Sequence, residues 1–170
     1  MPYDLSKPLV IGISSRALFN LEQENKIFEE QGVEAYEAYQ VTHENEILQK
    51  GAAFQLIKAF LKLNNTGLGR LVEVIIMSRN NANTCLRIFN SIQYYGLDIT
   101  RATLTSGAEI APYLKAFKTD LFLSANSVDV QSAINDGIAA GLILTGAAHA
   151  DAKQKIDQIR IAFDGDAVLF

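Results

Sequence analysis

The sequence has one cysteine, Cys85, and two histidines. A single cysteine cannot form an internal disulfide, which suits a reducing compartment, and we expect Cys85 to be a small buried residue rather than a nucleophile. His43 lies beside Glu44 and Glu46, but no second histidine stands at ligand spacing. A zinc site is therefore not predicted there, and we expect His43 to lie at the end of a solvated helix.

Basic residues and long apolar runs are also scarce. Fifteen Lys and Arg stand against nineteen Asp and Glu, which gives a net charge of -4. This balance does not predict the basic surface of a protein that binds a nucleic-acid polymer. No apolar run is long enough to span a bilayer, and the amino terminus has no signal-peptide pattern. We therefore expect a cytoplasmic protein without a membrane partner.

What the sequence does have is an alternation of apolar strands and helices. With 170 residues, 49% of them hydrophobic, the chain can bury a core. Strands are expected over 9–13, 72–77, 99–104, 121–124 and 138–144, and helices over 21–31, 33–46, 51–63, 82–95, 108–117 and 128–136. This order predicts a three-layer, Rossmann-like α/β fold, with a mostly parallel sheet and helices on both faces.

A further strand is expected at 159–170, after a polar stretch, and it carries Asp164 and Asp166 around Gly165. Ligands of parallel sheets bind at the carboxyl ends of strands, and glycine lets the backbone approach a ligand closely. Two carboxylates there suit magnesium, with one of them free to attack a phosphoryl group. We therefore predict that Asp164 and Asp166 form a catalytic and magnesium-binding pair.

The first expected strand has the same plan as the last one. Residues 10–19 and 160–169 both read as a strand, three small or polar residues, then alanine and two apolar residues. Ser14 stands where the second copy has Asp164, and Arg16 where it has Asp166. A chance likeness between buried strands is the alternative. If the duplication is real, residues 1–150 are a degenerate phosphatase-like domain, and 151–170 are a linker and the first strand of a catalytic unit.

Three residues are candidates for binding phosphate. Ser78 ends the strand at 72–77, and Asn80 follows it before a helix, where hydroxyl, amide and backbone donors favour an anion. Both residue types also cap helices without any ligand. Lys115 precedes the fourth strand and can neutralise phosphate, although an exposed lysine on a helix is ordinary.

Two resemblances follow from motifs. The pattern Asp164-x-Asp166-x-Val168 after an apolar strand resembles the first motif of haloacid-dehalogenase-type phosphatases. A wider set resembles the cytosolic 5'-nucleotidase type I family. It comprises Ile-Ser-Ser-Arg-Ala-Leu-Phe at 13–19, Glu-Gln-Gly-Val at 30–33, His-Glu-Asn-Glu at 43–46, Gly-Ile-Ala-Ala at 137–140, and the stretch 162–170.

This resemblance implies magnesium-dependent hydrolysis of nucleoside 5'-monophosphates, typically AMP. It implies that Asp164 is the phosphoryl acceptor and Asp166 the acid/base. The magnesium ligands would be Asp164 and the backbone carbonyl of Asp166. Members of the family continue past position 170, and their remaining catalytic motifs lie there. We therefore expect a fragment with little activity of its own.

The alternative is a non-catalytic module that binds a nucleotide or mediates oligomerisation. The strand expected at 159–170 either joins the edge of this sheet or pairs with another molecule, which would make a homo-oligomer.

Overall fold

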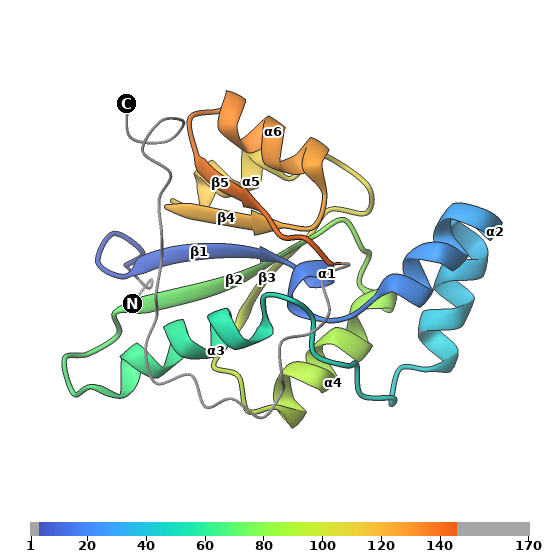
Figure 1. Cartoon of the computed structure of the whole chain (residues 1–170), viewed down its shortest axis with the longest axis horizontal. Coiled ribbons are helices and arrows are strands. Elements are labelled where there is room, and N and C mark those ends of the chain that lie inside the picture. The colour runs from blue at the N-terminus through green and yellow to red at the C-terminus, as the bar shows by residue number, and fades with distance from the viewer. Residues whose placement is uncertain (1–3, 146–170) are drawn as a thin grey trace.

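The computed structural model describes residues 4–145, and within them one parallel sheet forms the centre of the molecule (Figure 1). Its strands run in the order β3-β2-β1-β4-β5. Their bounds are β1 (Leu9–Ser14), β2 (Val72–Ser78), β3 (Arg101–Leu104), β4 (Leu121–Ser124) and β5 (Ala139–Leu142). The strand expected at 159–170 lies outside the described residues.

Helices connect successive strands. They are α1 (Ser15–Leu18), α2 (Glu22–Thr42), α3 (Phe54–Lys62), α4 (Leu86–Tyr94), α5 (Ala111–Ala116) and α6 (Ser127–Asn135), with 3-10 turns η1 (Leu63–Asn65) and η2 (Asn83–Cys85). All the strands and helices expected within 4–145 are present, with ends that differ by a few residues. The short helix α1 was not predicted, because four residues are too few to show a helical period.

The two longest strands lie in the middle of the sheet because nearly all their residues are buried on both faces. In β2 every residue is buried, and in β1 only Leu9 is exposed. β1 pairs with β2 on one side and with β4 on the other. The chain therefore reverses its direction of travel across the sheet at β1, and such a switch point opens a crevice at the carboxyl ends of the strands.

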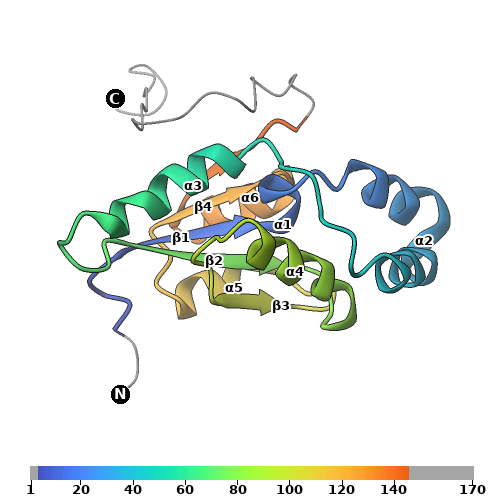
Figure 2. The same cartoon turned by 90° about the horizontal axis from the view of Figure 1, so that it is seen from below.

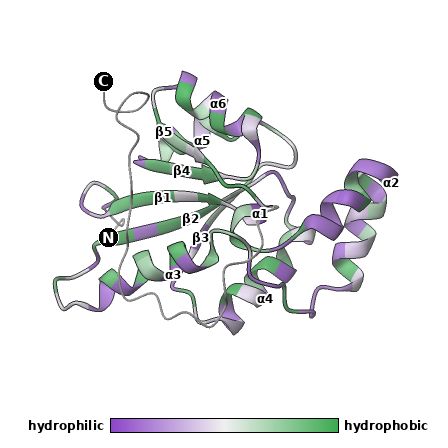
Figure 3. Cartoon of the chain, in the orientation of Figure 1, coloured by the Kyte–Doolittle hydropathy of each residue, from purple (hydrophilic) through white to green (hydrophobic). Residues whose placement is uncertain are grey.

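Two apolar layers cover the sheet. On one face, Ile11 and Ile13 of β1 pack with residues of α3 and α4, including Phe54, Ile57 and Ile88. The second cluster joins the other face of the strands to α5 and α6 and comprises Val10, Ile75, Met77, Ile110, Leu114, Phe122 and Ala133. Figures 1 and 2 show the two helix pairs on opposite faces of the sheet, and Figure 3 shows that the strands are largely hydrophobic. The predicted three-layer α/β architecture is confirmed.

Helix α2 projects beyond the carboxyl ends of the strands (Figure 2). It consists of two helical segments that meet at Gly32, whose φ of 85° and ψ of -175° are not helical. The break separates the helices expected over 21–31 and 33–46, so two helical segments are present as predicted. Arg87 of α4 donates a hydrogen bond to Glu24 at 2.6 Å, and both side chains are buried. This ion pair fixes the first segment of α2 against the body of the protein.

A close backbone contact holds the segment after β1 in place. The amide of Gly51 donates to the carbonyl of Leu18 at 2.9 Å. A Cβ at position 51 would lie 2.7 Å from the carbonyl oxygen of Ala17 and 2.8 Å from backbone atoms of Leu18 and Phe19. Only glycine permits this approach, which fixes α1 at the end of β1.

Candidate functional site

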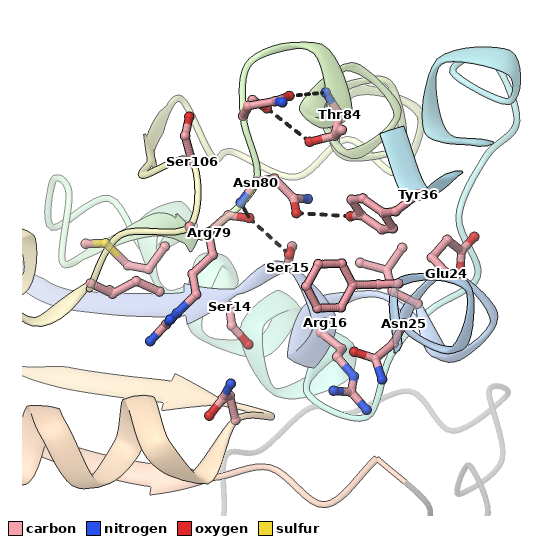
Figure 4. A pocket seen from close by; sticks show the side chains of 18 of the residues that line it. Ser14, Ser15, Arg16, Glu24, Asn25, Tyr36, Arg79, Asn80, Thr84 and Ser106 are labelled. Carbon is pink, nitrogen blue, oxygen red and sulfur yellow. Dashed lines mark hydrogen bonds between the residues drawn. The ribbon is translucent and has the colours of Figure 1, made fainter. Parts of the chain in front are cut away.

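A pocket of about 480 Å³ lies at the carboxyl ends of β1, β2 and β4, with α2 as its outer wall (Figure 4). This is the crevice expected at the switch point of the sheet. Its volume falls within the range of small-molecule sites. One end of the pocket is lined by serine, asparagine and arginine side chains, and the other by apolar and aromatic residues of α2 and the strand ends.

Serine hydroxyls stand at the ends of three neighbouring strands. Ser14 ends β1, Ser78 ends β2 and Ser124 ends β4, and all three are buried. The Ser14 Oγ accepts hydrogen bonds from the amides of Ala17 at 3.3 Å and Ala125 at 3.2 Å. These bonds tie β1 to α1 and to the loop after β4, so the hydroxyl has a fixed position.

The hydroxyls at the ends of β2 and β4 are held in the same way. The Ser78 Oγ accepts from the amide of Asn80 at 3.2 Å, and the Ser124 Oγ accepts from the amide of Asn126 at 3.1 Å. Ser15, the first residue of α1, lies with its Oγ 3.4 Å from that of Ser78. A row of neutral hydroxyls therefore lines the floor of the pocket.

Two arginines add positive charge, and each is paired. Arg79, directly after β2, donates through Nε and Nη2 to one oxygen of Asp129. Asp129 is buried in the first turn of α6, whereas the Arg79 side chain is 39% exposed. Arg16 pairs with Glu22 at 3.2 Å, and the hydrogen bond from Arg16 lowers the pKa of the Glu22 carboxyl.

The wall formed by α2 is joined to the loop after β2 by a chain of side-chain hydrogen bonds. Gln40 donates to the Tyr36 hydroxyl, and Tyr36 donates to Asn80 Oδ1, both at 3.0 Å. Burial raises the pKa of Tyr36, which keeps the phenol protonated as a donor. Phe28 packs edge-on against Tyr36, with 6.0 Å between ring centroids. In Figure 4, Tyr36 lies across the pocket from Ser14 and Arg79.

The sequence model of the 5'-nucleotidase family matches residues 1–170. This chain belongs to the 5'-nucleotidase family. It is 42% identical over 172 residues to cytosolic 5'-nucleotidase 1B of Homo sapiens, and the match covers 95% of this chain and 27% of that protein. The chain thus spans about a quarter of the length of this relative. The resemblance inferred from the motifs is confirmed.

Solved structures similar to this 5'-nucleotidase family member include the HAD domain of the effector protein Lem4 from Legionella pneumophila. The TM-score is 0.48 at 10% identity, with 85% of this chain and 91% of that chain covered. An inactive mutant of the same domain gives 0.47 at 10% identity, with 84% and 88% covered. Both scores are below 0.5, and the α/β fold of this chain is shown by its own strand order.

The structure brings two of the predicted phosphate-binding residues of the 5'-nucleotidase chain together. Ser78 and Asn80 both line the pocket, and the hydrogen bond between them fixes their relative position. Ala82 is the N-cap of η2 and makes no side-chain cap hydrogen bond, and just before it the Oδ1 of Asn81 accepts from the amide of Thr84 at 3.0 Å. Ser78 and Asn80 are therefore not occupied in capping a helix.

Lys115 is not brought to the pocket. It lies on α5, where its Nζ is 3.3 Å from a carboxylate oxygen of Asp136 after α6, and its side chain is 58% exposed. The geometry gives Lys115 an ordinary surface ion pair. Asp164 and Asp166 lie outside the described residues, so their predicted catalytic and metal-binding roles stay predictions.

Sequence reasoning missed the Arg79–Asp129 pair and the part that Ser15, Phe28 and Tyr36 play in the pocket. A signal for the first was available, because Arg79 immediately follows a buried strand at the ligand-binding edge. The pairing with Asp129 was not foreseeable, since it joins residues 50 positions apart. Phe28 precedes the break at Gly32 and Tyr36 follows it, and both line the pocket.

Cys85 is buried, as predicted, and lies behind the wall of the pocket rather than on its lining. Burial raises the pKa of its thiol to about 12. The thiol is therefore neutral at physiological pH and unsuited to nucleophilic attack.

Within residues 4–145 no group of three or more His, Cys, Asp or Glu side chains is placed to hold a metal ion. Nor does any helix in this described part of the 5'-nucleotidase chain have the length and apolarity needed to cross a membrane. The pocket as described can therefore offer a ligand hydroxyls, amides and guanidinium groups. It is also lined by the carboxylates of Glu24, Glu37 and Asp129, which pair with Arg87, Asn81 and Arg79.

Proposed function

We propose that this chain is part of a 5'-nucleotidase of the cytoplasm that hydrolyses AMP-like nucleoside 5'-monophosphates to nucleoside and phosphate. The observation that carries the proposal is the family match over all 170 residues. The similarity to a human protein named cytosolic 5'-nucleotidase 1B supports it. Residues 1–150 would form a phosphatase-like unit without acidic chemistry, and 151–170 would open the catalytic unit.

In the proposed reaction, a carboxylate oxygen of Asp164 attacks phosphorus, and the bond from phosphorus to the nucleoside 5'-oxygen breaks. Asp166 donates a proton to that oxygen, and the nucleoside leaves. Asp166 then takes a proton from water, which attacks the aspartyl-phosphate and releases inorganic phosphate. The carboxylate pair suits a hard cation, and magnesium held by Asp164 and the Asp166 carbonyl would offset the charge of the phosphate.

The test compares this chain with a longer protein that includes the rest of the family's length. Asp164→Asn in the longer protein is expected to lower magnesium-dependent AMP hydrolysis by at least about a thousandfold, because the nucleophile is lost. Asp151→Asn serves as a matched control in the same segment and should leave the rate unchanged.

The 170-residue chain alone is expected to be nearly inactive. Its residues 1–150 have no acidic pair of their own, because Ser14 and Arg16 stand at the positions that match Asp164 and Asp166. Robust magnesium-dependent AMP hydrolysis by this chain, abolished by Asp164→Asn, would overturn that expectation.

A second candidate function is a non-catalytic one. The pocket at the carboxyl edge supports a unit that binds a nucleotide, and an oligomerisation role is the alternative if nothing binds. Calorimetric titration of the chain with AMP, with and without magnesium, separates these roles: heat of binding without turnover supports the first. An absence of binding combined with a concentration-dependent mass in solution supports the second.

A further inference from the structure

We propose that the pocket is a metal-independent site for a phosphate monoester that carries a planar ring, the class to which nucleoside monophosphates belong. In this site, Arg79 leaves Asp129 to bind the phosphate. The proposal deepens the nucleotide-binding role suggested above. It does not depend on the chemistry assigned to Asp164, which belongs to a different segment.

The serines at the strand ends are set up as donors toward the pocket. A serine hydroxyl has one proton to donate and two lone pairs to accept with. The Oγ atoms of Ser14, Ser78 and Ser124 each already accept at least one backbone amide. Each hydroxyl keeps one proton that can turn to an acceptor in the pocket, although Ser78 and Ser15 share a hydroxyl contact at 3.4 Å in which either can be the donor. Phosphate oxygens are strong acceptors.

Arg79 already binds an oxyanion. Its guanidinium holds one carboxylate oxygen of Asp129 through two nitrogens, beside the first turn of α6. Arginine recognises phosphate and carboxylate with the same fork of donors. The Arg79 side chain is partly exposed and lines the pocket, so it can move to a phosphate there. Asp129 thus competes with the ligand and lowers its affinity.

The other end of the pocket suits a planar ring. Phe28 is 47% exposed although it lines the pocket, and Val33 beside it is 54% exposed. Tyr36 is held in place by Gln40 and Asn80 and supports the edge of the Phe28 ring. A rigid, accessible aromatic face is a surface on which a nucleobase stacks. The site therefore has a phosphate end and a ring end.

The donors proposed for this site are hydroxyls and a guanidinium, which bind phosphate oxygens directly. Within the described residues, no cluster of acidic, histidine or cysteine side chains could hold a metal cation. Binding through hydroxyls and a guanidinium should therefore survive removal of metal by a chelator, whereas binding at a carboxylate pair should not.

The experiment is calorimetric titration of the 170-residue chain in excess EDTA with AMP, inorganic phosphate and adenosine. AMP is expected to bind more tightly than either of its parts. Arg79→Gln should weaken AMP and phosphate about tenfold or more, since hydrogen bonds to charged groups are lost. Lys115→Gln is the matched control, because it also removes the cation of an ion pair, and it should leave affinity unchanged.

Two further variants separate the ends of the site. Asp129→Asn should raise the affinity for AMP and phosphate by about threefold to tenfold, because Arg79 is released. Phe28→Ala should weaken AMP about tenfold and leave phosphate unchanged, since stacking is lost. Thermal unfolding of each variant shows whether it is folded, and opposite shifts for Arg79→Gln and Asp129→Asn cannot come from misfolding.

Absence of AMP binding in EDTA by the folded chain would overturn the proposal, as would equal affinity of the wild type and Arg79→Gln. If Asp164→Asn abolishes binding and Arg79→Gln does not, the ligand sits at the carboxyl-terminal motif. That result would contradict this inference and leave the proposed nucleotidase function standing. Normal binding in EDTA with an inactive longer protein would support this inference and contradict the nucleotidase function.

Discussion

The two edges of the sheet carry opposite kinds of polar group. At the carboxyl edge, neutral hydroxyls of Ser14, Ser78 and Ser124 surround a hollow. At the amino edge, Glu73 of β2 is fully buried and pairs with both Arg70 and Arg101. The amino edge thus holds a buried charged network, whereas the floor of the pocket at the carboxyl edge holds neutral hydroxyls with the Arg79–Asp129 ion pair beside them.

The other acids at the amino edge are also committed to structure. Asp98, before β3, pairs with Arg70 at 2.8 Å, and Asp120, before β4, accepts from the amide of Val10 at 2.8 Å. Because ligands of parallel sheets bind at the carboxyl edge, these carboxylates serve the fold rather than chemistry. The comparison teaches that a count of acidic residues says little about metal binding until it is known whether they lie at the amino or the carboxyl edge of the sheet.

The largest expected effect tests the charged edge. Glu73→Gln should lower the free energy of unfolding by about 3 kcal/mol, because two arginines lose the buried charge that pairs with them. Urea denaturation measures the change. The exposed Glu109→Gln is the control, with an expected change within about 0.5 kcal/mol. Equal effects would show that the amino edge is not held by charge.

Close to the neutral carboxyl edge lies the buried thiol of Cys85, and high pH should destabilise the protein through it. Folding raises the pKa of Cys85 from 9.0 to about 12. The thiol's contribution to stability is therefore fully present below pH 9 and is lost as pH rises toward 12. The loss should be about 1.4 kcal/mol per pH unit above 9.

Cys85→Ala should remove that part of the alkaline loss, as measured by urea denaturation at pH 8 and pH 10.5. An unchanged pH dependence in Cys85→Ala would assign the loss to other groups, such as Tyr36, whose pKa is also raised by burial.

Adding carboxylates to the carboxyl edge should give that edge a magnesium site and so remove its difference from an acidic, metal-binding edge. In a chain with Asp164→Asn and Asp166→Asn, the further pair Ser14→Asp and Arg16→Asp places two carboxylates one residue apart after β1. Magnesium at ten times its dissociation constant should then stabilise the protein by about 1.4 kcal/mol, as a rise in melting temperature. Arg16→Asp alone is the control, and a similar rise there would show that the spacing is irrelevant.

The smallest effect is expected from the surface of α5 and α6. Lys115→Gln removes a largely exposed ion pair with Asp136 and should change the free energy of unfolding by no more than about 0.5 kcal/mol. Chemical denaturation at low and high salt measures it. A loss above 1 kcal/mol would mean that this pair supports the packing of α5 against α6.

The sequence was a good guide to the fold, because the strands are apolar runs and their order follows from alternation with helices. The helix expected over 51–63 is found as α3, and its apolar residues Phe54, Ile57, Phe60 and Leu61 are all buried. The helix expected over 82–95 ends before Gly96, whose φ of 61° a glycine adopts without strain.

The site was only half predictable. Ser78 and Asn80 could be located because one ends a strand and the other follows it, which puts both at the ligand-binding edge. This holds whatever the order of the strands in the sheet. Lys115 could not be placed, because the direction of a helical side chain depends on how α5 packs against α6. The wall formed by Phe28 and Tyr36 depends on the angle at Gly32, and no periodicity in the sequence encodes that angle.

The break at Gly32 also has a stereochemical consequence. Its positive φ is the region that mirror-image amino acids prefer, and a Cβ there would meet nothing within 4 Å. An L-alanine at this position would be strained by about 1 to 3 kcal/mol. A D-alanine, introduced by chemical ligation, prefers this backbone region and would restrict the backbone of the unfolded chain. One inverted chiral centre would thus stiffen the bend of α2 while leaving every side chain of the pocket intact.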